Sequence, residues 1–296
     1  MEHIVAPDED GRRLRDILRQ VMGVSYSAMK SAKWDQRILV DSQTAPVNTI
    51  LRAGQRVTML WPEERPAYTL RPYAIPLRIP YQDEHLLIVD KPAPLASQSS
   101  AGHPDNSLEN ALYAHFGCPA DFVYRPVNRL DKGTSGLMVV ARTAHAQHRL
   151  QQLLHTPDFR RTYLAVTQGI PVPAEGVVDA PIMKENAASI RRIVRADGKP
   201  SVTRYQLERI SGSRALVRLM LETGRTHQIR VHMRHLGCPV CGDFLYGEEL
   251  PELPGRFALH SAEVRLLHPI TGERLLLGSA LPTALEALLT PDAPRP

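Results

Sequence analysis

The first sixty residues show apolar positions at helical spacing and then at strand spacing. Between Arg12 and Met22 apolar side chains recur at i, i+3, i+4 and i+7, which predicts an amphipathic helix. These side chains are Leu14, Ile17, Leu18 and Val21. Ser25 is a good N-cap for a second helix that runs through Trp34. Short strands are expected over 37–40 and 55–60, so this region predicts two helices and a small sheet.

Prolines interrupt the pattern in the next segment. They stand at Pro62, Pro66, Pro72, Pro76 and Pro80. Proline fixes its own backbone angle and lacks an N–H donor, so such a run favours a semi-extended linker over a helix or strand. We therefore expect an N-terminal domain over residues 1–61, a linker over 62–78 and a large domain over 79–296.

Strands and helices are mixed in the large domain. Apolar runs and alternating patterns predict strands over 85–89, 137–141, 161–168, 201–210 and 214–222. Helices are expected from a cap at Thr143 to His155, and from a cap at Thr226 to near Gly237. The segments 263–267 and 274–277 flank a turn at 269–272 and predict a hairpin.

Positive charge is concentrated near the N-terminus. The formal net charge is +5 and the isoelectric point is about 9.2. Between Gly11 and Leu60, nine lysines and arginines stand against three acidic residues, a surplus larger than that of the whole chain. Such a concentration predicts a polyanionic partner, nucleic acid above all. A solvated surface is the alternative that the charge alone leaves open.

The sequence shows neither a targeting segment nor a disulfide framework. Its N-terminus is acidic and lacks an apolar leader. No stretch approaches the ~20 apolar residues of a membrane-spanning helix. Three cysteines do not suggest a set of disulfides. We therefore expect a cytoplasmic protein that does not enter a membrane.

The most informative stretch of the chain reads Arg-Leu-Asp-Lys-Gly-Thr-Ser-Gly over 129–136. It places a carboxylate, with an arginine two residues before it, at a turn that opens an apolar strand. Catalytic groups are often found where a loop meets a rigid element, so Asp131 is the candidate for chemistry. Asp-Lys-Gly-Thr is also a good β-turn, and the octapeptide alone leaves both interpretations open.

Four further segments follow this motif along the chain. They are 161–169, 198–205, 223–233 with Gly242–Asp243 and Tyr246–Gly247 after it, and 259–262 with 268–273. In this order the segments closely resemble the RluA-type pseudouridine synthases, which isomerise uridine in ribosomal or transfer RNA. The match covers 79–289. Residues 11–60 resemble the alpha-L RNA-binding domain of small-subunit ribosomal proteins, by the order of elements and by charge.

The resemblance implies an α+β fold, in which a catalytic domain with a mixed, largely antiparallel sheet follows a small N-terminal α/β RNA-binding domain. It also implies that Asp131 is the catalytic aspartate, Arg230 the cation that holds it and Tyr163 the platform for the base. Guanidinium pairs with carboxylate in a bidentate geometry, and a tyrosine ring can stack on uracil. Taken alone, Arg230 is equally an RNA-facing or solvated arginine, and Tyr163 a core tyrosine.

Other basic residues are candidates for RNA contacts. By resemblance, Arg129 fills the space that a flipped base leaves, or grips the backbone; a plain phosphate contact is the alternative. The segment 184–204 is rich in basic residues and predicts an RNA-contacting hairpin or loop. The remaining candidates are Arg12, Arg13, Lys30, Lys33 and Arg37 near the N-terminus, and Arg191, Arg192 and Lys199 in the basic segment.

Two features stand apart from this pattern. Asn128 occupies the position where the family usually has histidine before Arg-Leu-Asp, and asparagine can still hydrogen-bond. Cys238 and Cys241 have the CxxC spacing of zinc and redox sites, but no second pair accompanies them and they fall inside a synthase segment. We therefore expect no metal. The isomerisation breaks the N1–C1′ bond and joins C5 to C1′ without redox change or group donor, so no cofactor is expected.

The sequence thus predicts a cofactor-free RNA pseudouridine synthase. RNA is the expected partner, with ribosomal RNA preferred over transfer RNA, and we expect a monomer. The main alternative is a non-catalytic RNA-binding or ribosome-assembly protein on a synthase scaffold, and Asn128 is the feature in its favour. A nucleoside hydrolase, which would use the same carboxylate but release the free base, is a second alternative.

Overall fold

The computed structural model of this chain describes residues 1–62 and 68–290. They divide into two compact units, the first Met1–Ala67 with Ala120–Val123 and the second Tyr68–Pro119 with Tyr124–Pro296. Each unit has its own hydrophobic core. Residues 63–67 of the expected linker lie outside the described residues, and 68–77 form neither helix nor strand.

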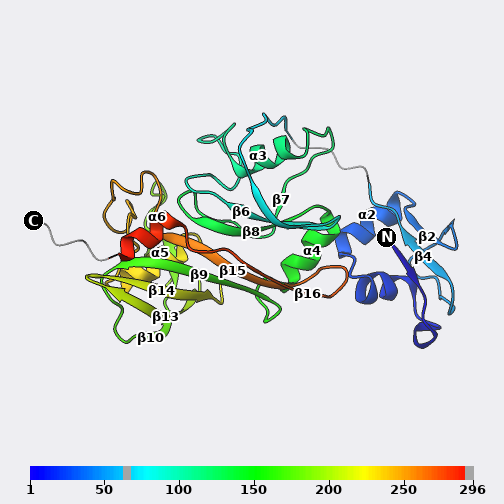
Figure 1. Cartoon of the computed structure of the whole chain (residues 1–296). Coiled ribbons are helices and arrows are strands. Elements are labelled where there is room, and N and C mark those ends of the chain that lie inside the picture. The colour runs from blue at the N-terminus through cyan, green and yellow to red at the C-terminus, as the bar shows by residue number, and fades with distance from the viewer. Residues whose placement is uncertain (63–67, 291–296) are drawn as a thin grey trace, which may run out of the picture. The chain divides into compact units, whose positions relative to one another are not determined.

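The first unit combines helical segments with a four-stranded antiparallel sheet (Figure 1). The strands, in sheet order, are β1 (Glu2–Ile4), β4 (Arg56–Met59), β2 (Ile38–Val40) and β3 (Gln43–Thr44). The helical segments are a 3₁₀ turn over Pro7–Glu9, α1 (Leu14–Asp16) with a π-helical turn over Ile17–Val21, and α2 (Tyr26–Trp34). Leu14, Ile17, Leu18, Val57 and Met59 are buried together, so the amphipathic stripe faces the sheet.

Both helices and both strands expected in this unit are confirmed. The Ser25 hydroxyl caps α2 by accepting a hydrogen bond from Ala28 N at 3.1 Å. The first helix begins later than expected, because Arg13 is extended and forms a β-bridge with Ile50. Strand β1 escapes prediction because three residues are too few to establish a period.

The second unit is built on a mixed sheet with ten strands among its described residues. The main path runs β10 (Glu175–Asp179), β13 (Val202–Ser211), β14 (Arg214–Leu221), β9 (Phe159–Gln168), β15 (Leu259–Leu267), β8 (Ser135–Ala141), β6 (Leu86–Lys91), β5 (Arg78–Gln82). Strand β16 (Arg274–Gly278) pairs with β15, and β7 (Arg125–Pro126) pairs with β8. The strands β15 and β8 are parallel, and the other pairs are antiparallel. The expected α+β fold is confirmed.

A small ribbon and four short helices complete this unit within its described residues. The ribbon pairs β11 (Ile182–Lys184) with β12 (Arg192–Val194). The helices are α3 (Leu108–His115), α4 (Ala144–Leu153), α5 (Gln228–His235) and α6 (Thr283–Glu286), with a 3₁₀ turn over Ala287–Leu289 after the last. The predicted cap of α4 is confirmed, since the Thr143 hydroxyl accepts from Ala146 N at 3.1 Å.

The predicted cap at Thr226 is wrong. Helix α5 begins at Gln228 and follows His227, whose backbone is left-handed with φ of 59°. The loop before α5 is held instead by the first residue of the helix. The Gln228 side-chain oxygen accepts hydrogen bonds from Arg225 N at 2.9 Å and from the Thr223 hydroxyl at 2.8 Å. A side chain in the first turn of a helix can therefore replace a preceding cap.

The parallel pair β8–β15 brings the Arg-Leu-Asp motif beside the start of β15. Ser135 lies opposite His260, and Gly136 opposite Ser261. Gly136 has φ of 108°, and a Cβ added there would lie 2.3 Å from the Ser261 carbonyl oxygen. The glycine of the motif therefore permits the close approach of the two strands.

We expect Gly136→Ala to lower the free energy of unfolding by about 2–4 kcal/mol, because it combines an unfavourable backbone angle with a backbone clash. Urea unfolding measures this loss. The matched control is Gly212→Ala, since Gly212 has φ of 56° but no atom within 4 Å of an added Cβ. Only the conformational cost of about 1 kcal/mol remains there. Equal losses in the two variants would contradict the close-approach explanation.

Candidate active site

Asp131 lies in the turn that precedes β8. Thr134 N donates to Asp131 O at 3.0 Å, and the strand begins at the next residue. The Ser97 hydroxyl bonds to both the backbone N–H and the carbonyl of Leu130, which fixes the residue before the aspartate. The carboxylate itself is 27 % exposed. A β-turn at Asp131 is therefore compatible with a functional role for its side chain, because the turn fixes the backbone while the carboxylate stays accessible.

Arg230 joins Asp131 to a second carboxylate. Its Nη1 donates to Asp131 Oδ2 at 2.9 Å. Its Nε and Nη2 donate to Asp243 Oδ2 and Oδ1 at 2.7 and 2.8 Å. The bidentate pair expected for Asp131 is thus made with Asp243, a fully buried carboxylate for which the sequence predicted no role. The feature of the sequence that points to Asp243 is its position just after a glycine, in a segment rich in turn residues.

The guanidinium of Arg230 is enclosed by aromatic rings as well as by carboxylates. Its carbon lies 4.1 Å from the ring centroid of Phe257 and 4.9 Å from that of Tyr246. Burial lowers the pKa of Arg230, but the hydrogen bonds to Asp243 and the charge of Asp131 outweigh burial and raise the pKa above its ordinary value. Arg230 is therefore a permanent buried cation that holds Asp131 through Oδ2.

Tyr163 lies on β9, opposite Ser261 of β15 and Leu219 of β14. Its side chain is buried, as expected of a tyrosine on the inner face of a central strand. It lines a cavity of about 600 Å³ together with Asp131. The structure therefore brings Tyr163, Asp131 and Arg230 into one region from three elements that are distant in sequence.

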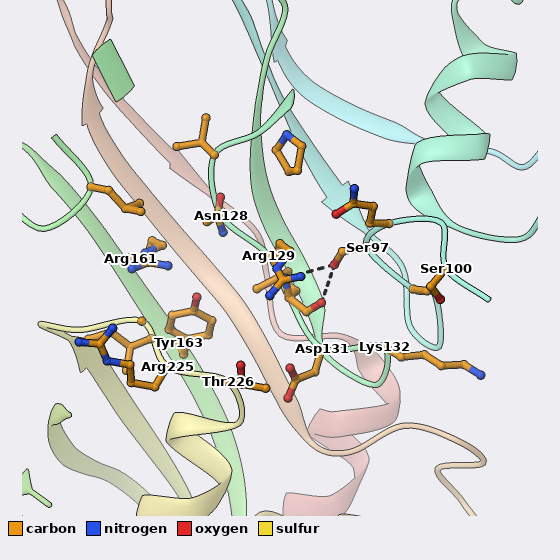
Figure 2. A pocket seen from close by; sticks show the side chains of 18 of the residues that line it. Ser97, Ser100, Asn128, Arg129, Asp131, Lys132, Arg161, Tyr163, Arg225 and Thr226 are labelled. Atoms are coloured by element: carbon orange, nitrogen blue, oxygen red, sulfur yellow. Dashed lines mark hydrogen bonds between the residues drawn. The ribbon is translucent and has the colours of Figure 1, made fainter. Parts of the chain in front are cut away.

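The charged side chains that line this cavity are mostly basic. Arg129, Lys132, Arg161 and Arg225 contribute cations, and Asp131 contributes the acidic group. In Figure 2 the side chains of Arg161, Tyr163 and Arg225 gather opposite Asp131. Arg129 is exposed and Arg161 is buried, so the two differ in how far they reach solvent. A basic wall around one carboxylate suits a polyanionic substrate.

Lys91 supports the aspartate turn from inside the protein, and sequence analysis missed it. The side chain is fully buried, and its Nζ donates to the carbonyl oxygens of Leu95, Pro92 and Lys132 at 2.7, 3.1 and 3.4 Å. Burial lowers the pKa of Lys91 from 10.5 to about 7, against the opposing charge of Asp131. The available signal was the position of the lysine directly after an apolar strand, in Asp-Lys-Pro.

Asn128 has a structural partner. Its side-chain oxygen accepts from Val139 N at 2.9 Å, which ties the segment before the motif to β8. The side chain is 5 % exposed and also lines the large cavity. Asn128 thus holds the segment before the motif against β8 through its oxygen, while its Nδ2 is buried without a hydrogen-bond partner among the described residues.

The two cysteines of the CxxC spacing are buried in a turn. Cys241 N donates to Val166 O at 2.9 Å. Burial raises the pKa of both Cys238 and Cys241 to about 11, so both thiols keep their protons at neutral pH. Within the described residues, no cluster of three or more histidine, cysteine or acidic side chains is arranged to hold a metal ion. Over the same residues, no helix is long and apolar enough to cross a membrane.

The basic residues predicted to contact RNA occupy different environments. In the first unit, Arg13, Lys30 and Lys33 are exposed. Arg12 donates to Gln20 and Arg37 pairs with Asp35, so these two are engaged locally. In the second unit Lys199 is exposed, while Arg191 and Arg192 are half-buried at the β11–β12 ribbon. The expected basic hairpin thus exists, and its contact with RNA stays a prediction.

Comparison with known proteins agrees with this geometry. The model of the RNA pseudouridylate synthase family matches residues 85–235. The ribosomal large subunit pseudouridine synthases D of Xanthomonas campestris and Escherichia coli K12 are both 37% identical to this chain, over 98% and 96% of it and 92% of each relative. An uncharacterised RNA pseudouridine synthase of Bacillus subtilis is 36% identical over 90% of this chain and 95% of its own length.

Solved structures show the same likeness. The human RNA pseudouridylate synthase domain-containing proteins 4 and 1 match with TM-scores of 0.57 and 0.59 and identities of 26% and 25%. The matches cover 70% and 73% of this chain and 90% and 89% of the human chains. This chain belongs to the RNA pseudouridylate synthase family. It is an RNA-modifying isomerase, as its resemblance to the RluA-type synthases predicts, whereas the likeness of residues 11–60 to the alpha-L domain stays a prediction.

We expect Asp243→Asn to destabilise the protein by about 3 kcal/mol, because it leaves a buried guanidinium without its bidentate partner. Activity should fall as well, since Arg230 then loses its fixed direction toward Asp131. Urea unfolding and a turnover assay measure the two effects. The matched control is Asp197→Asn, which breaks a bidentate pair with Arg195 that lies in solvent and should change stability little. Similar losses for both variants would contradict the role of burial.

Lys91 should give the protein a characteristic pH dependence. Between pH 7 and 10.5 the unfolded chain keeps the proton on this lysine, while the folded protein releases it. The unfolded state binds more protons in this window, so stability rises with pH, by at most about 1.4 kcal/mol per pH unit. We expect Lys91→Met to remove this contribution to the slope. Urea unfolding from pH 7 to pH 9 tests it, with Lys199→Met as the exposed control, and parallel curves for wild type and Lys91→Met would contradict it.

Proposed function

We propose that this synthase isomerises uridines of ribosomal RNA to pseudouridine, with Asp131 as its catalytic carboxylate. The observation that carries the proposal is the position of Asp131: it supplies the acidic group of a basic cavity and is held by a buried arginine. The names of the relatives from Xanthomonas campestris and Escherichia coli support ribosomal RNA of the large subunit as the substrate class. Transfer RNA is the second candidate, and an enzyme for either RNA would act in the cytoplasm.

The chemistry assigns a role to each partner of Asp131. Breaking the N1–C1′ bond and joining C5 to C1′ requires a carboxylate beside the sugar and base, and Arg230 holds Asp131 in place through one oxygen. The ring of Tyr163 offers a flat face on which the uracil can stack while it turns. Arg129 is suited to the RNA strand beside the reacting nucleotide, because it is exposed at the wall of the same cavity.

The remaining basic residues are proposed to bind RNA outside the reacting nucleotide. The exposed side chains of Arg13, Lys30 and Lys33 support an RNA-binding role for the domain over 1–61. The exposed side chain of Lys199 supports an RNA-binding role for the basic segment that contains the β11–β12 ribbon. We propose that residues 62–78 link this domain to the catalytic domain over 79–296, and that a single copy carries out the reaction.

The test of this proposal is tritium release from RNA labelled at uridine C5, because C5 loses its hydrogen when it bonds to the sugar. We expect release from ribosomal RNA made in cells that lack the protein, and none with Asp131→Ala. That variant should still fold and bind RNA, since Arg230 retains its bidentate pair with Asp243. The exposed Asp158 provides the control Asp158→Ala, which should release tritium as the wild type does.

Each other outcome has a distinct meaning. An active Asp131→Ala enzyme would overturn the assignment of the carboxylate. Release from transfer RNA alone would replace the proposed substrate class. Free uracil among the products would indicate a nucleoside hydrolase in place of a synthase.

A further inference from the structure

His227 faces the catalytic region without having been assigned a role. It lines a small cavity of about 60 Å³ together with Asp131, Tyr163 and Arg230. Its Nε2 lies 4.0 Å from Asp131 Oδ2. Its backbone is left-handed, with φ of 59°, which is unfavourable for a residue that carries a Cβ. Such backbone strain is often found where the side chain has a function.

Two hydrogen bonds determine which ring nitrogen of His227 carries the hydrogen. Arg192 N donates to the Tyr246 hydroxyl at 2.7 Å, because a backbone N–H can only donate. Tyr246 is 1 % exposed, so its own O–H needs an acceptor inside the protein. His227 Nδ1 lies 2.8 Å away and is the acceptor that the described residues offer. With Nδ1 accepting, a neutral imidazole carries its hydrogen on Nε2, the nitrogen that faces Asp131.

The charges around His227 agree with a neutral ring. Burial lowers the pKa of His227, and the positive charges of Arg230 and Arg192 lower it further, while Asp131 and Asp243 act in the opposite direction. The net shift is downward, so the ring is neutral at pH 7 and carries a single N–H. The tautomer that Tyr246 selects therefore decides whether His227 presents a donor or an acceptor to the aspartate.

Both His227 and Arg230 approach the same oxygen of Asp131. Arg230 Nη1 bonds to Oδ2 at 2.9 Å, and His227 Nε2 faces Oδ2. Oδ1 of Asp131 has no hydrogen-bond partner among the described residues. A movement of about 1 Å would bring His227 Nε2 within hydrogen-bonding distance of Oδ2. Oδ2 is thereby the anchored oxygen and Oδ1 the one open to a substrate.

We propose that His227 is a positioning residue for the isomerisation, which donates its Nε2–H to Asp131 Oδ2 and so presents Oδ1 to the uridine. The inference rests on the proposed function of Asp131. Two hydrogen bonds, from Arg192 N to the Tyr246 hydroxyl and from that hydroxyl to His227 Nδ1, connect the β11–β12 ribbon to the imidazole. The ribbon thereby holds the imidazole in the tautomer that the reaction uses.

The test compares His227→Asn with wild type in single-turnover and steady-state tritium release. Asparagine tolerates a left-handed backbone but is too short to reach Asp131, so the fold should survive. We expect kcat to fall roughly tenfold to a hundredfold, as for the loss of one hydrogen bond to a charged group, with KM unchanged. The matched control is His232→Gln: His232 is buried on helix α5, which begins just after His227, and it bonds to Thr203 and Ala180, away from Asp131.

Chemical rescue separates a positioning role from a structural one. His227→Gly also accommodates the left-handed backbone, and it leaves a space of imidazole size beside Asp131. Added imidazole should restore part of the lost kcat in His227→Gly and none in Asp131→Ala. Nitrogen-15 NMR of the imidazole in the wild type should show the neutral Nε2–H tautomer at pH 7, and Tyr246→Phe should weaken that preference.

Three results would overturn the inference. They are wild-type kcat in His227→Asn, a loss in His227→Gly that imidazole does not restore, and an Nδ1–H tautomer in the wild type. An inactive wild type, or an active Asp131→Ala enzyme, would instead overturn the proposed function on which the inference rests. Because Asp131→Ala is assayed in the same series, the two failures are distinguishable.

Discussion

A buried guanidinium requires buried or nearby carboxylates, and this requirement organises the site. Arg230 is almost wholly removed from water, so its charge is tolerated only while its partners are in place. Asp243 supplies two of its hydrogen bonds and Asp131 the third. Asp243 also accepts from the backbone N–H groups of Leu245 and Tyr246 and so holds its own turn. One charge thus fixes helix α5, this turn and the turn before β8 relative to one another.

The two carboxylates that bond to Arg230 differ in exposure to solvent, and this difference gives them different roles. Asp243 has no exposed surface and neutralises the arginine. Asp131 keeps 27 % of its side chain exposed and bonds to the arginine through Oδ2, so it remains accessible from the cavity. Because Asp243 supplies two of the three hydrogen bonds to the buried guanidinium, Asp131 supplies only one and is partly exposed.

The sheet provides a rigid frame, and the turn before β8 presents Asp131. The parallel pair β8–β15 sets the motif turn beside β15, and Gly136 allows the strands to approach. Buried Lys91 ties the loop after β6 to the carbonyl of Lys132, next to the aspartate. Lys91 also donates to the carbonyls of Pro92 and Leu95, which stabilises an irregular loop close to the site.

Local rules predicted many of the elements, and the resemblance to a family supplied the candidate site residues. The cap at Ser25 and the hairpin β15–β16 follow from the sequence, because the hydrogen bonds that define them join residues close along the chain. A motif of several segments singled out Asp131, Tyr163 and Arg230. The tertiary structure alone decided the partners: Asp243 as the bidentate carboxylate, the burial of Lys91, and the left-handed His227 where a cap at Thr226 was expected. The physical reason is that a buried charge or donor is satisfied by whatever lies near it in space, and periodicity along the chain carries no information about that distance.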